Sequence, residues 1–153
     1  MMNLNKRSIL LLCALGAAPL GAQAETVELS GSLRATVAKT LMPLGNGGSV
    51  ITASSHGIAA VSTSPPTLMD TNCAGMGYLP AEGEPETEFY CTFSANENDR
   101  LDLKGTDGPG GGTATVIGGS GKWQGATGGG SFTREASTDT TSSSTFKLKL
   151  TTP

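Results

Sequence analysis

GGSGKWQGATGGG, residues 118–130, decides the fold of this 153-residue chain. Seven glycines in this stretch surround Lys122 and Trp123, the only tryptophan, and residues 131–133 then begin a strand-like pattern. Glycine reaches positive φ without steric cost, so such a run builds tight turns. A flexible Gly/Ser linker does not normally keep a large aromatic side chain at its centre. We therefore expect a fixed turn in a β-structure, with Trp123 buried against the sheet.

On either side of this stretch, apolar residues recur at every second position, which is the spacing of a β-strand. Residues 26–41 alternate in this way around Leu29, and residues 87–95 alternate around Phe89 and Phe93. Seven to nine short strands predict an all-β domain, either a sandwich or a barrel, with one antiparallel core. The other expected strands are residues 49–55, 57–62 (which continues the preceding strand or stands alone), 73–79, 100–105, 113–117, 131–136 and 145–150, and mobile loops are expected at 82–86 and 137–144.

Residues 1–24 predict a secretory signal peptide. Lys6 and Arg7 form its basic start, residues 9–15 form a short apolar core, and a small-residue cleavage site ends at Ala24. We expect cleavage after Ala24, export to the bacterial periplasm or medium, and a single mature domain at 25–153. No segment reaches the roughly 18 apolar residues that a membrane helix needs, so membrane insertion is not expected.

The charge of the mature chain argues against polyanionic partners. Because the leader carries two basic residues and no acidic one, its removal changes the formal net charge from −3 to −5. An acidic chain that is poor in lysine and arginine lacks the basic surface of a nucleic-acid binder. Anionic membrane surfaces are equally poor partners. We expect no nucleic-acid partner.

Two cysteines remain after the leader and its Cys13 are removed. In an oxidising compartment, Cys73 and Cys91 allow one intramolecular disulfide, which closes a loop of 18 residues. The alternative is a reactive or metal-binding thiol pair. That alternative needs further ligands, whereas His56 is the only histidine and no Cys-x-x-Cys motif occurs. The sequence favours a structural disulfide.

The chain contains no recognised catalytic or cofactor-binding motif. A phosphate-binding loop needs glycine where Val116 stands and Ser or Thr where Trp123 stands, and Gln124 occupies the third glycine position of a dinucleotide fingerprint. A single histidine and the lack of a Gly-x-Ser-x-Gly elbow give no support to a catalytic triad or a zinc or copper site. We expect no metal and no cofactor, and the sequence favours a non-enzymatic protein.

Three pieces of the second half occur in the order found in one known family. They are Cys73-Ala74-Gly75 with Cys91 on the next strand, the acidic turn at residues 96–101, and the glycine-rich stretch. In these pieces the chain resembles the allene oxide cyclase barrel-like family, to which plant dirigent proteins are related, and looks like a bacterial exported member. The match covers about residues 70–135, and Ser120 replaces a threonine that is usual in the family. The signature residues are Gly118, Gly119, Gly121, Lys122, Trp123, Gly125 and Gly128.

This resemblance implies a calycin-like, eight-stranded antiparallel barrel with a small apolar cavity, often assembled as an oligomer. An eight-stranded barrel has an interior that is either filled by side chains or holds one small molecule. We therefore expect a small apolar ligand and a homo-oligomer. No catalytic residue is carried over, because the N-terminal half matches the family only in its pattern of strands.

Five polar residues in expected strands are candidates for ligand binding. They lie on the faces opposite their apolar neighbours, and the pattern does not say which face lines the interior. On the outside they are ordinary solvated side chains. Inside a cavity, desolvation would raise the pKa of a carboxyl group and suit it to acid–base chemistry. The candidates are Glu28, Arg34, Glu88, Tyr90 and Arg100.

The sequence leaves three functional hypotheses. The first, which we favour, is a non-enzymatic exported barrel that binds a small apolar or aromatic ligand or a surface partner. The second is a cyclase-like or dirigent-like catalyst that confines a lipid or phenolic intermediate, and it rests on the resemblance alone. The third is a structural protein with a solid barrel and a binding surface.

Overall fold

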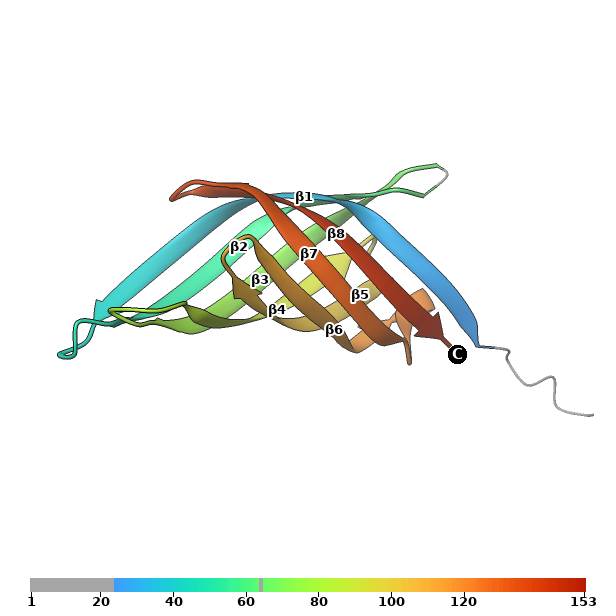
Figure 1. Cartoon of the computed structure of the whole chain (residues 1–153). Coiled ribbons are helices and arrows are strands. Elements are labelled where there is room, and N and C mark those ends of the chain that lie inside the picture. Colours follow the sequence, from blue (N-terminus) through green and yellow to red (C-terminus); the bar gives the residue numbers. More distant parts are fainter. Residues whose placement is uncertain (1–23, 64) are drawn as a thin grey trace, which may run out of the picture.

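Eight antiparallel strands close into one barrel (Figure 1), which confirms the expected fold class. The structure is a computed structural model that describes residues 24–63 and 65–153. The signal peptide expected at residues 1–24 lies outside the described residues, apart from Ala24. The elements are β1 (Glu25–Pro43), β2 (Ser49–Val61), β3 (Thr67–Leu79), β4 (Glu86–Ser94), β5 (Arg100–Gly108), β6 (Gly111–Ser120), the 3₁₀ helix η1 (Gly121–Trp123), β7 (Thr127–Ser137) and β8 (Thr141–Thr152).

Each strand pairs with the next one along the chain, and β8 returns to pair with β1. The closing ladder runs from Glu25 opposite Thr152 to Thr36 opposite Thr141. A closed ring removes the free edges at which sheets otherwise associate. Among residues 24–63 and 65–153 there is no helix with the length and apolar character of a membrane span.

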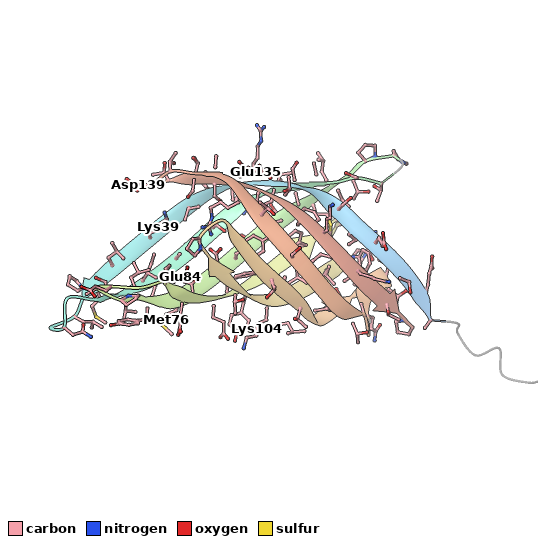
Figure 2. The ribbon with its side chains drawn as sticks, viewed as in Figure 1. Lys39, Met76, Glu84, Lys104, Glu135 and Asp139 are labelled. Atoms are coloured by element: carbon pink, nitrogen blue, oxygen red, sulfur yellow. A yellow bond between two sulfur atoms is a disulfide. The ribbon has the colours of Figure 1, made fainter. Side chains whose placement is uncertain are left out.

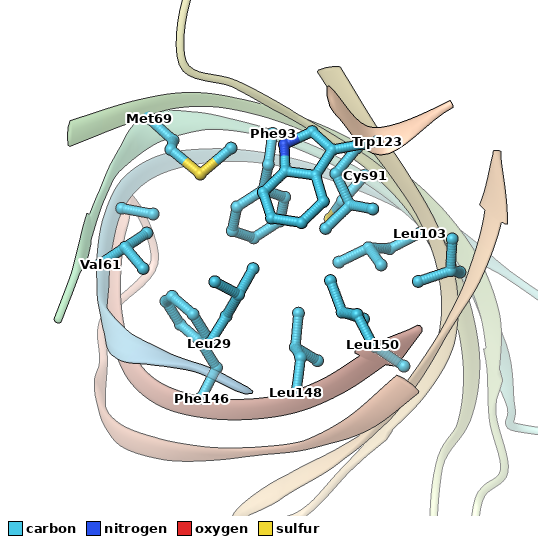
Figure 3. Packing of buried hydrophobic residues seen from close by; sticks show 14 of the residues in the cluster. Leu29, Val61, Met69, Cys91, Phe93, Leu103, Trp123, Phe146, Leu148 and Leu150 are labelled. Carbon is cyan, nitrogen blue, oxygen red and sulfur yellow. The ribbon is translucent and has the colours of Figure 1, made fainter. Parts of the chain in front are cut away.

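Apolar side chains face the interior, as the period-two pattern requires in a barrel. The two largest of the fully buried side chains, Leu101 and Leu150, have 1% and 0% of their surface exposed. Figure 3 looks into this core, where Trp123 and Phe93 lie on one side and Leu148 on the other. The core gathers at one end of the barrel, and we call this the closed end.

Several strands are longer than expected, and one expected loop is a tight hairpin. Residues 57–61 continue β2 without a break, and β3 begins at Thr67 rather than at residue 73. The expectation of a mobile loop at residues 137–144 was wrong. There the Thr138 side-chain oxygen accepts hydrogen bonds from the N–H groups of Thr140 and Thr141, and the Thr138 N–H donates to the Thr141 carbonyl. These hydrogen bonds form a tight turn, so only three residues connect β7 to β8.

Two turns clamp the closed end, and both belong to the pieces that carry the family resemblance. The N–H of Lys122, in η1, donates to Asp99 Oδ1 at 3.0 Å, and the Ser120 hydroxyl donates to the Asn98 carbonyl at 2.8 Å. Gly121 has φ +60° and lies so close to Asp99 and Asn98 that a Cβ would collide with both. The glycine is therefore required by both the backbone conformation and the close approach.

Trp123 closes this end of the barrel. Its indole is 5% exposed and belongs to the buried cluster, as the sequence led us to expect. The ammonium group of Lys122 lies 5.0 Å from the centroid of the Trp123 ring system, which is cation–π distance. The glycine-rich stretch is thus a plug whose backbone is held by one turn and whose side chain completes the core.

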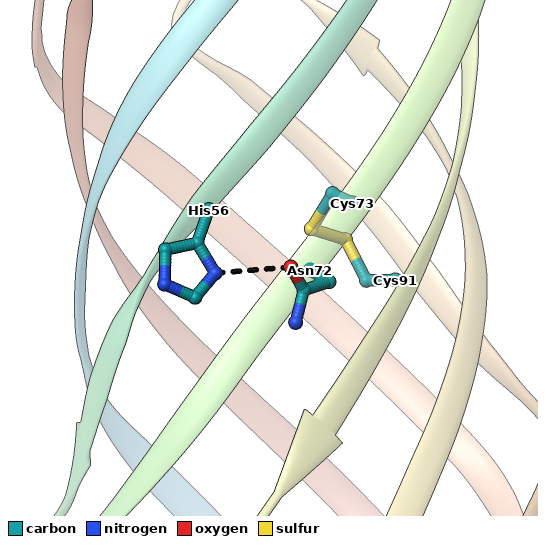
Figure 4. The surroundings of a disulfide bond; sticks show 4 residues. All are labelled: His56, Asn72, Cys73 and Cys91. Atoms are coloured by element: carbon teal, nitrogen blue, oxygen red, sulfur yellow. Dashed lines mark hydrogen bonds between the residues drawn. A yellow bond between two sulfur atoms is a disulfide. The ribbon is translucent and has the colours of Figure 1, made fainter.

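A disulfide joins Cys73 on β3 to Cys91 on β4, which confirms the expected pairing. The two cysteines are directly opposite each other in the ladder and face the interior. Figure 4 shows this bridge next to Asn72, whose side chain lies on the outer face and bonds His56 at 2.9 Å. The disulfide covalently links β3 to β4 in the middle of the barrel wall.

We predict that Cys73→Ala/Cys91→Ala lowers the free energy of unfolding by about 3 kcal/mol, because the crosslink of 18 residues restricts the unfolded chain. Urea unfolding followed by Trp123 fluorescence measures this loss. Wild-type protein that has been reduced should unfold at the same urea concentration as the variant. A loss below about 1 kcal/mol would show that the bridge contributes little beyond packing.

Asp99 gives the closed end a pH dependence. Hydrogen bonds from the Lys122 N–H, and next from the Asn96 side chain, lower the pKa of the Asp99 carboxyl below its ordinary value. A lowered folded-state pKa stabilises the protein above the unfolded-state value, and the contribution is lost as the pH falls through the folded-state value. Asp99→Asn should therefore destabilise the protein at neutral pH, and the difference from wild type should shrink below about pH 4.

Urea midpoints measured between pH 7 and pH 3 test this expectation. Asp139→Asn, in the exposed β7–β8 turn, is the matched control and should follow the wild-type profile. A gap between Asp99→Asn and wild type that stays constant down to pH 3 would contradict the assigned role of the carboxylate.

Candidate functional site

The end of the barrel opposite the plug is hollow. A cavity of about 390 Å³ opens there between the β1–β2, β3–β4, β5–β6 and β7–β8 connections. This volume falls within the range of small-molecule sites, roughly 300–1,000 Å³. Its apolar lining includes Leu33, Val37, Phe89, Leu103, Phe132 and Phe146.

Inward-facing glycines make room for two aromatic rings that line this cavity. Gly105 on β5 is the direct partner of Phe89 on β4, and a Cβ at Gly105 would collide with the Phe89 ring and the Thr113 carbonyl. Gly112 is likewise opposite Phe132. The two phenylalanine rings therefore lie across glycine backbone and meet edge to face, with 5.5 Å between their centroids. The wall of the cavity at this point is therefore formed by the faces and edges of two aromatic rings.

One ion pair faces this apolar space. Arg134 on β7 bonds the carboxylate of Asp107 on β5, and its Nη1 donates to the Gly108 carbonyl at 3.2 Å. Each of the two charged side chains is only 29% exposed. Strand β6 lies between their strands, and the pair lies at the mouth of the lumen beside the β5–β6 turn.

A second cation lies farther out on the rim. Lys39 also lines the cavity and donates from Nζ to the Thr138 carbonyl at 3.3 Å, which links β1 to the β7–β8 turn. Figure 2 labels Lys39 at the same end of the barrel as Asp139, a residue of that turn. Lys39 is exposed, so water screens its charge more than that of Arg134.

The five residues predicted to bind a ligand lie in strands with their side chains on the outer wall. All five are exposed, and the structure does not gather them into one site. Of the five, Glu88 alone contributes to the lining of the cavity. Their ligand-binding role remains a prediction, and for the four other than Glu88 it would operate outside the lumen. They are Glu28 and Arg34 on β1, Glu88 and Tyr90 on β4, and Arg100 on β5.

Glu88 and Tyr90 form a polar cluster with Lys104, which Figure 2 labels on the outer wall. Glu88 Oε1 is 2.8 Å from Lys104 Nζ, and the Tyr90 hydroxyl donates to Glu88 Oε2 at 3.3 Å. The hydrogen bond from Lys104 is the main reason that the pKa of Glu88 lies below its ordinary value. The same bond raises the pKa of Lys104. Glu88 is therefore a stabilised carboxylate, which makes it a poor general acid.

Other outer-wall groups also lack a catalytic arrangement. His56 lies within β2 rather than at a turn, and bonds Asn72, whose amide donates to Asp70 at 3.0 Å. In the described ranges, no three His, Cys, Asp or Glu side chains come close enough together to hold a metal ion. The lumen is a largely apolar space with one ion pair at its mouth.

The sequence offered no signal that would have paired Asp107 with Arg134. The two residues are 27 positions apart on strands that are not neighbours, and both are inward-facing positions occupied by charge. A charge on the apolar face of a strand is the one mark that could have singled them out. At Arg134 that mark was weak, because the expected strand at residues 131–136 has Phe132 as its only large apolar residue.

We predict that Gly105→Ala destabilises the protein by about 1–3 kcal/mol, because the added methyl group must displace the Phe89 ring or β6. Gly108→Ala is the matched control, since a Cβ there finds its nearest atom 3.8 Å away at the Gly111 carbonyl oxygen. Urea unfolding compares the two variants. Equal stability would mean that the glycine at position 105 is not needed for the cavity wall.

Comparison with solved structures places this barrel among known folds. The structure of the pterocarpan synthase dirigent protein GePTS1 superimposes with a TM-score of 0.57 and 12% sequence identity, covering 88% of this chain and 94% of that chain. The pterocarpan synthase dirigent protein PsPTS1 gives a TM-score of 0.48 and 14% identity over 84% and 94% of the two chains. No protein-family model matches the chain, and no curated protein sequence matches it. The chain shares the barrel fold of a dirigent protein.

Proposed function

We propose that this protein is an exported barrel that binds one small apolar or aromatic molecule in its lumen. The observation that carries the proposal is the cavity of about 390 Å³, walled by aliphatic and aromatic side chains and closed at one end by Trp123. The disulfide between Cys73 and Cys91 supports an oxidising compartment and hence export to the periplasm or medium.

The cavity suits binding better than covalent chemistry. A ligand that buries about 200 Å² of apolar surface gains about 5 kcal/mol from its transfer out of water. Because association costs at least about 4 kcal/mol in lost freedom, this burial alone gives weak binding. Preformed shape must supply the rest. The edge-to-face pair of Phe89 and Phe132 is such a preformed surface, because each ring is held against glycine backbone.

A second candidate function is dirigent-like confinement of a reactive phenolic or lipid intermediate. It is supported by the fold shared with GePTS1, which is described as a pterocarpan synthase dirigent protein. A confining barrel would alter the stereochemistry of products formed by an external oxidant. Chiral chromatography of coupled phenols, with and without the protein, tests this function, and an unchanged product distribution argues for simple binding.

Surface binding and self-association form a separate part of the proposal. Large apolar side chains are exposed on β2 and β3, among them Ile58 (47%), Leu68 (65%) and Met76 (64%). These side chains support the proposal that a partner protein or a second copy of this chain binds the outer wall. The family resemblance, which implies an oligomer, supports the same proposal. Light scattering coupled to size-exclusion chromatography measures the state of the free protein.

We predict that Ala53→Trp abolishes binding of the neutral fluorescent probe phenylnaphthylamine, because the new side chain fills the lumen from β2. Ala38→Trp adds the same side chain at an exposed position on the outer face of β1 and should bind the probe as wild type does. Native mass spectrometry of wild type purified from its own host identifies any molecule carried in the lumen.

The two tryptophan variants separate the lumen from the outer wall. Loss of probe binding in both, or in neither, would contradict the lumen as the binding site. Circular dichroism verifies that each variant keeps the β-barrel, and a probe that fails to bind wild type would count against the proposal itself.

A further inference from the structure

The ion pair between Arg134 and Asp107 differs from the other ion pairs of the barrel. Three of the four pairs found among residues 24–63 and 65–153 lie on the outer wall, with at least one partner more than 40% exposed. In the fourth, both partners are 29% exposed and face the lumen. The barrel therefore directs a single ion pair toward its otherwise apolar cavity.

Stability does not explain why this pair is present. A partly buried ion pair loses hydration, and it offsets that loss only when its remaining polar atoms are also bonded. Asp107 Oδ1 is covered and receives no hydrogen bond from the described residues. The β5–β6 turn is already held by the Arg134 backbone N–H, which donates to the Gly110 carbonyl at 2.8 Å. Apolar side chains of similar size often replace such a pair without loss of stability.

The guanidinium group has hydrogen-bonding capacity to spare. Arginine carries five N–H donors and no acceptor. Within the described part of the chain, the Arg134 side chain donates to Asp107 Oδ2 and to the Gly108 carbonyl. Because the group is partly exposed at the cavity mouth, its remaining donors are available to an oxygen atom that enters the lumen.

The neighbouring carboxylate determines which kind of oxygen suits this site. Asp107 neutralises the charge of Arg134 and would repel a second anion placed beside it. Its free oxygen is covered, so a group that only donates a hydrogen bond finds no acceptor there. An uncharged acceptor, such as a ketone, ester or quinone oxygen, meets the spare donors without that repulsion.

We infer that Arg134, held by Asp107, determines ligand specificity: the lumen selects an apolar molecule that ends in an uncharged carbonyl oxygen at the mouth. This inference rests on the proposed function, since it names the class of molecule that the lumen binds. The apolar body of the ligand lies against Phe89 and Phe132, and its oxygen accepts a hydrogen bond from Arg134.

Two probes of nearly the same shape test this inference. Acetylnaphthalene carries the carbonyl, and ethylnaphthalene carries a methylene group in its place. Wild type should bind acetylnaphthalene about tenfold more tightly, as a hydrogen bond from a charged donor implies. Competition with phenylnaphthylamine measures both affinities.

Arg134→Met/Asp107→Leu replaces the pair with apolar side chains. The variant should bind the two probes equally, with its affinity for ethylnaphthalene unchanged or improved. His56→Leu/Asp70→Leu removes a polar pair from the outer wall, where the partners are 64% and 45% exposed, and should keep the wild-type preference. Arg134→Lys keeps a charged hydrogen-bonding group. Compared with Arg134→Met/Asp107→Leu, it should therefore retain part of the preference for acetylnaphthalene.

The outcomes separate this inference from the function on which it rests. Equal binding of the two probes by wild type, or a preference that survives in Arg134→Met/Asp107→Leu, overturns the role of Arg134 and leaves lumen binding intact. Failure of wild type to bind either probe overturns both. A folded double variant with no preference supports the inference, and urea unfolding verifies that it is folded. A double variant that does not fold shows that the pair is structural and also overturns it.

Discussion

The hydrogen-bonded ladder between β1 and β8 is the constraint on which the rest of this structure depends. It closes eight consecutive strands into a ring. Every second side chain then faces the interior of the barrel, whereas in an open sheet both faces would be exposed. Residues distant in the chain then share one interior, and Leu29 near its start packs with Leu148 and Leu150 near its end. The lumen, the plug and the position of Arg134 all presuppose that closure.

The two ends of the barrel differ in the size of their inward-facing residues. The closed end contains large side chains such as Leu101, Phe93 and Trp123, and it supplies most of the apolar burial that stabilises the fold. The hollow end has glycine at inward positions such as Gly75 and Gly105, and this gives up packing energy for space. A protein evolved only for stability would fill that space, because empty volume costs free energy. This difference between the two ends is consistent with the proposed binding function.

Local patterns predicted much of the fold and little of the site. Alternation located the strands, because it is a property of short segments. The disulfide was predicted because two cysteines in an oxidising compartment allow one pairing. Strand ends were less predictable: glycines at 111 and 128 look like breaks in a sequence, yet they pair in the closed sheet. The hairpin at Thr138 depends on hydrogen bonds from one side chain, which composition does not reveal.

The candidate site depends on three-dimensional relations that alternation does not encode. The five polar candidates were chosen because they sit opposite apolar neighbours, and in a barrel with an apolar lining that same criterion puts them outside. Asp107 and Arg134 are brought together across an intervening strand by the tilt and register of the sheet, which no single segment determines. The glycine-rich stretch likewise predicted the turn that closes one end of the barrel, but it gave no information about the residues at the open end.

The ladder between Glu25 and Thr152 also decides how the molecule can be held. β1 begins and β8 ends at the plugged end (Figure 1), so a tether joined to Glu25 or to Thr152 attaches there and leaves the mouth turned away. The barrel can therefore be immobilised on a bead or an electrode with its lumen facing the solution. Residues 44–48 and 80–85 then become the segments to vary when the opening is redesigned as a sensor.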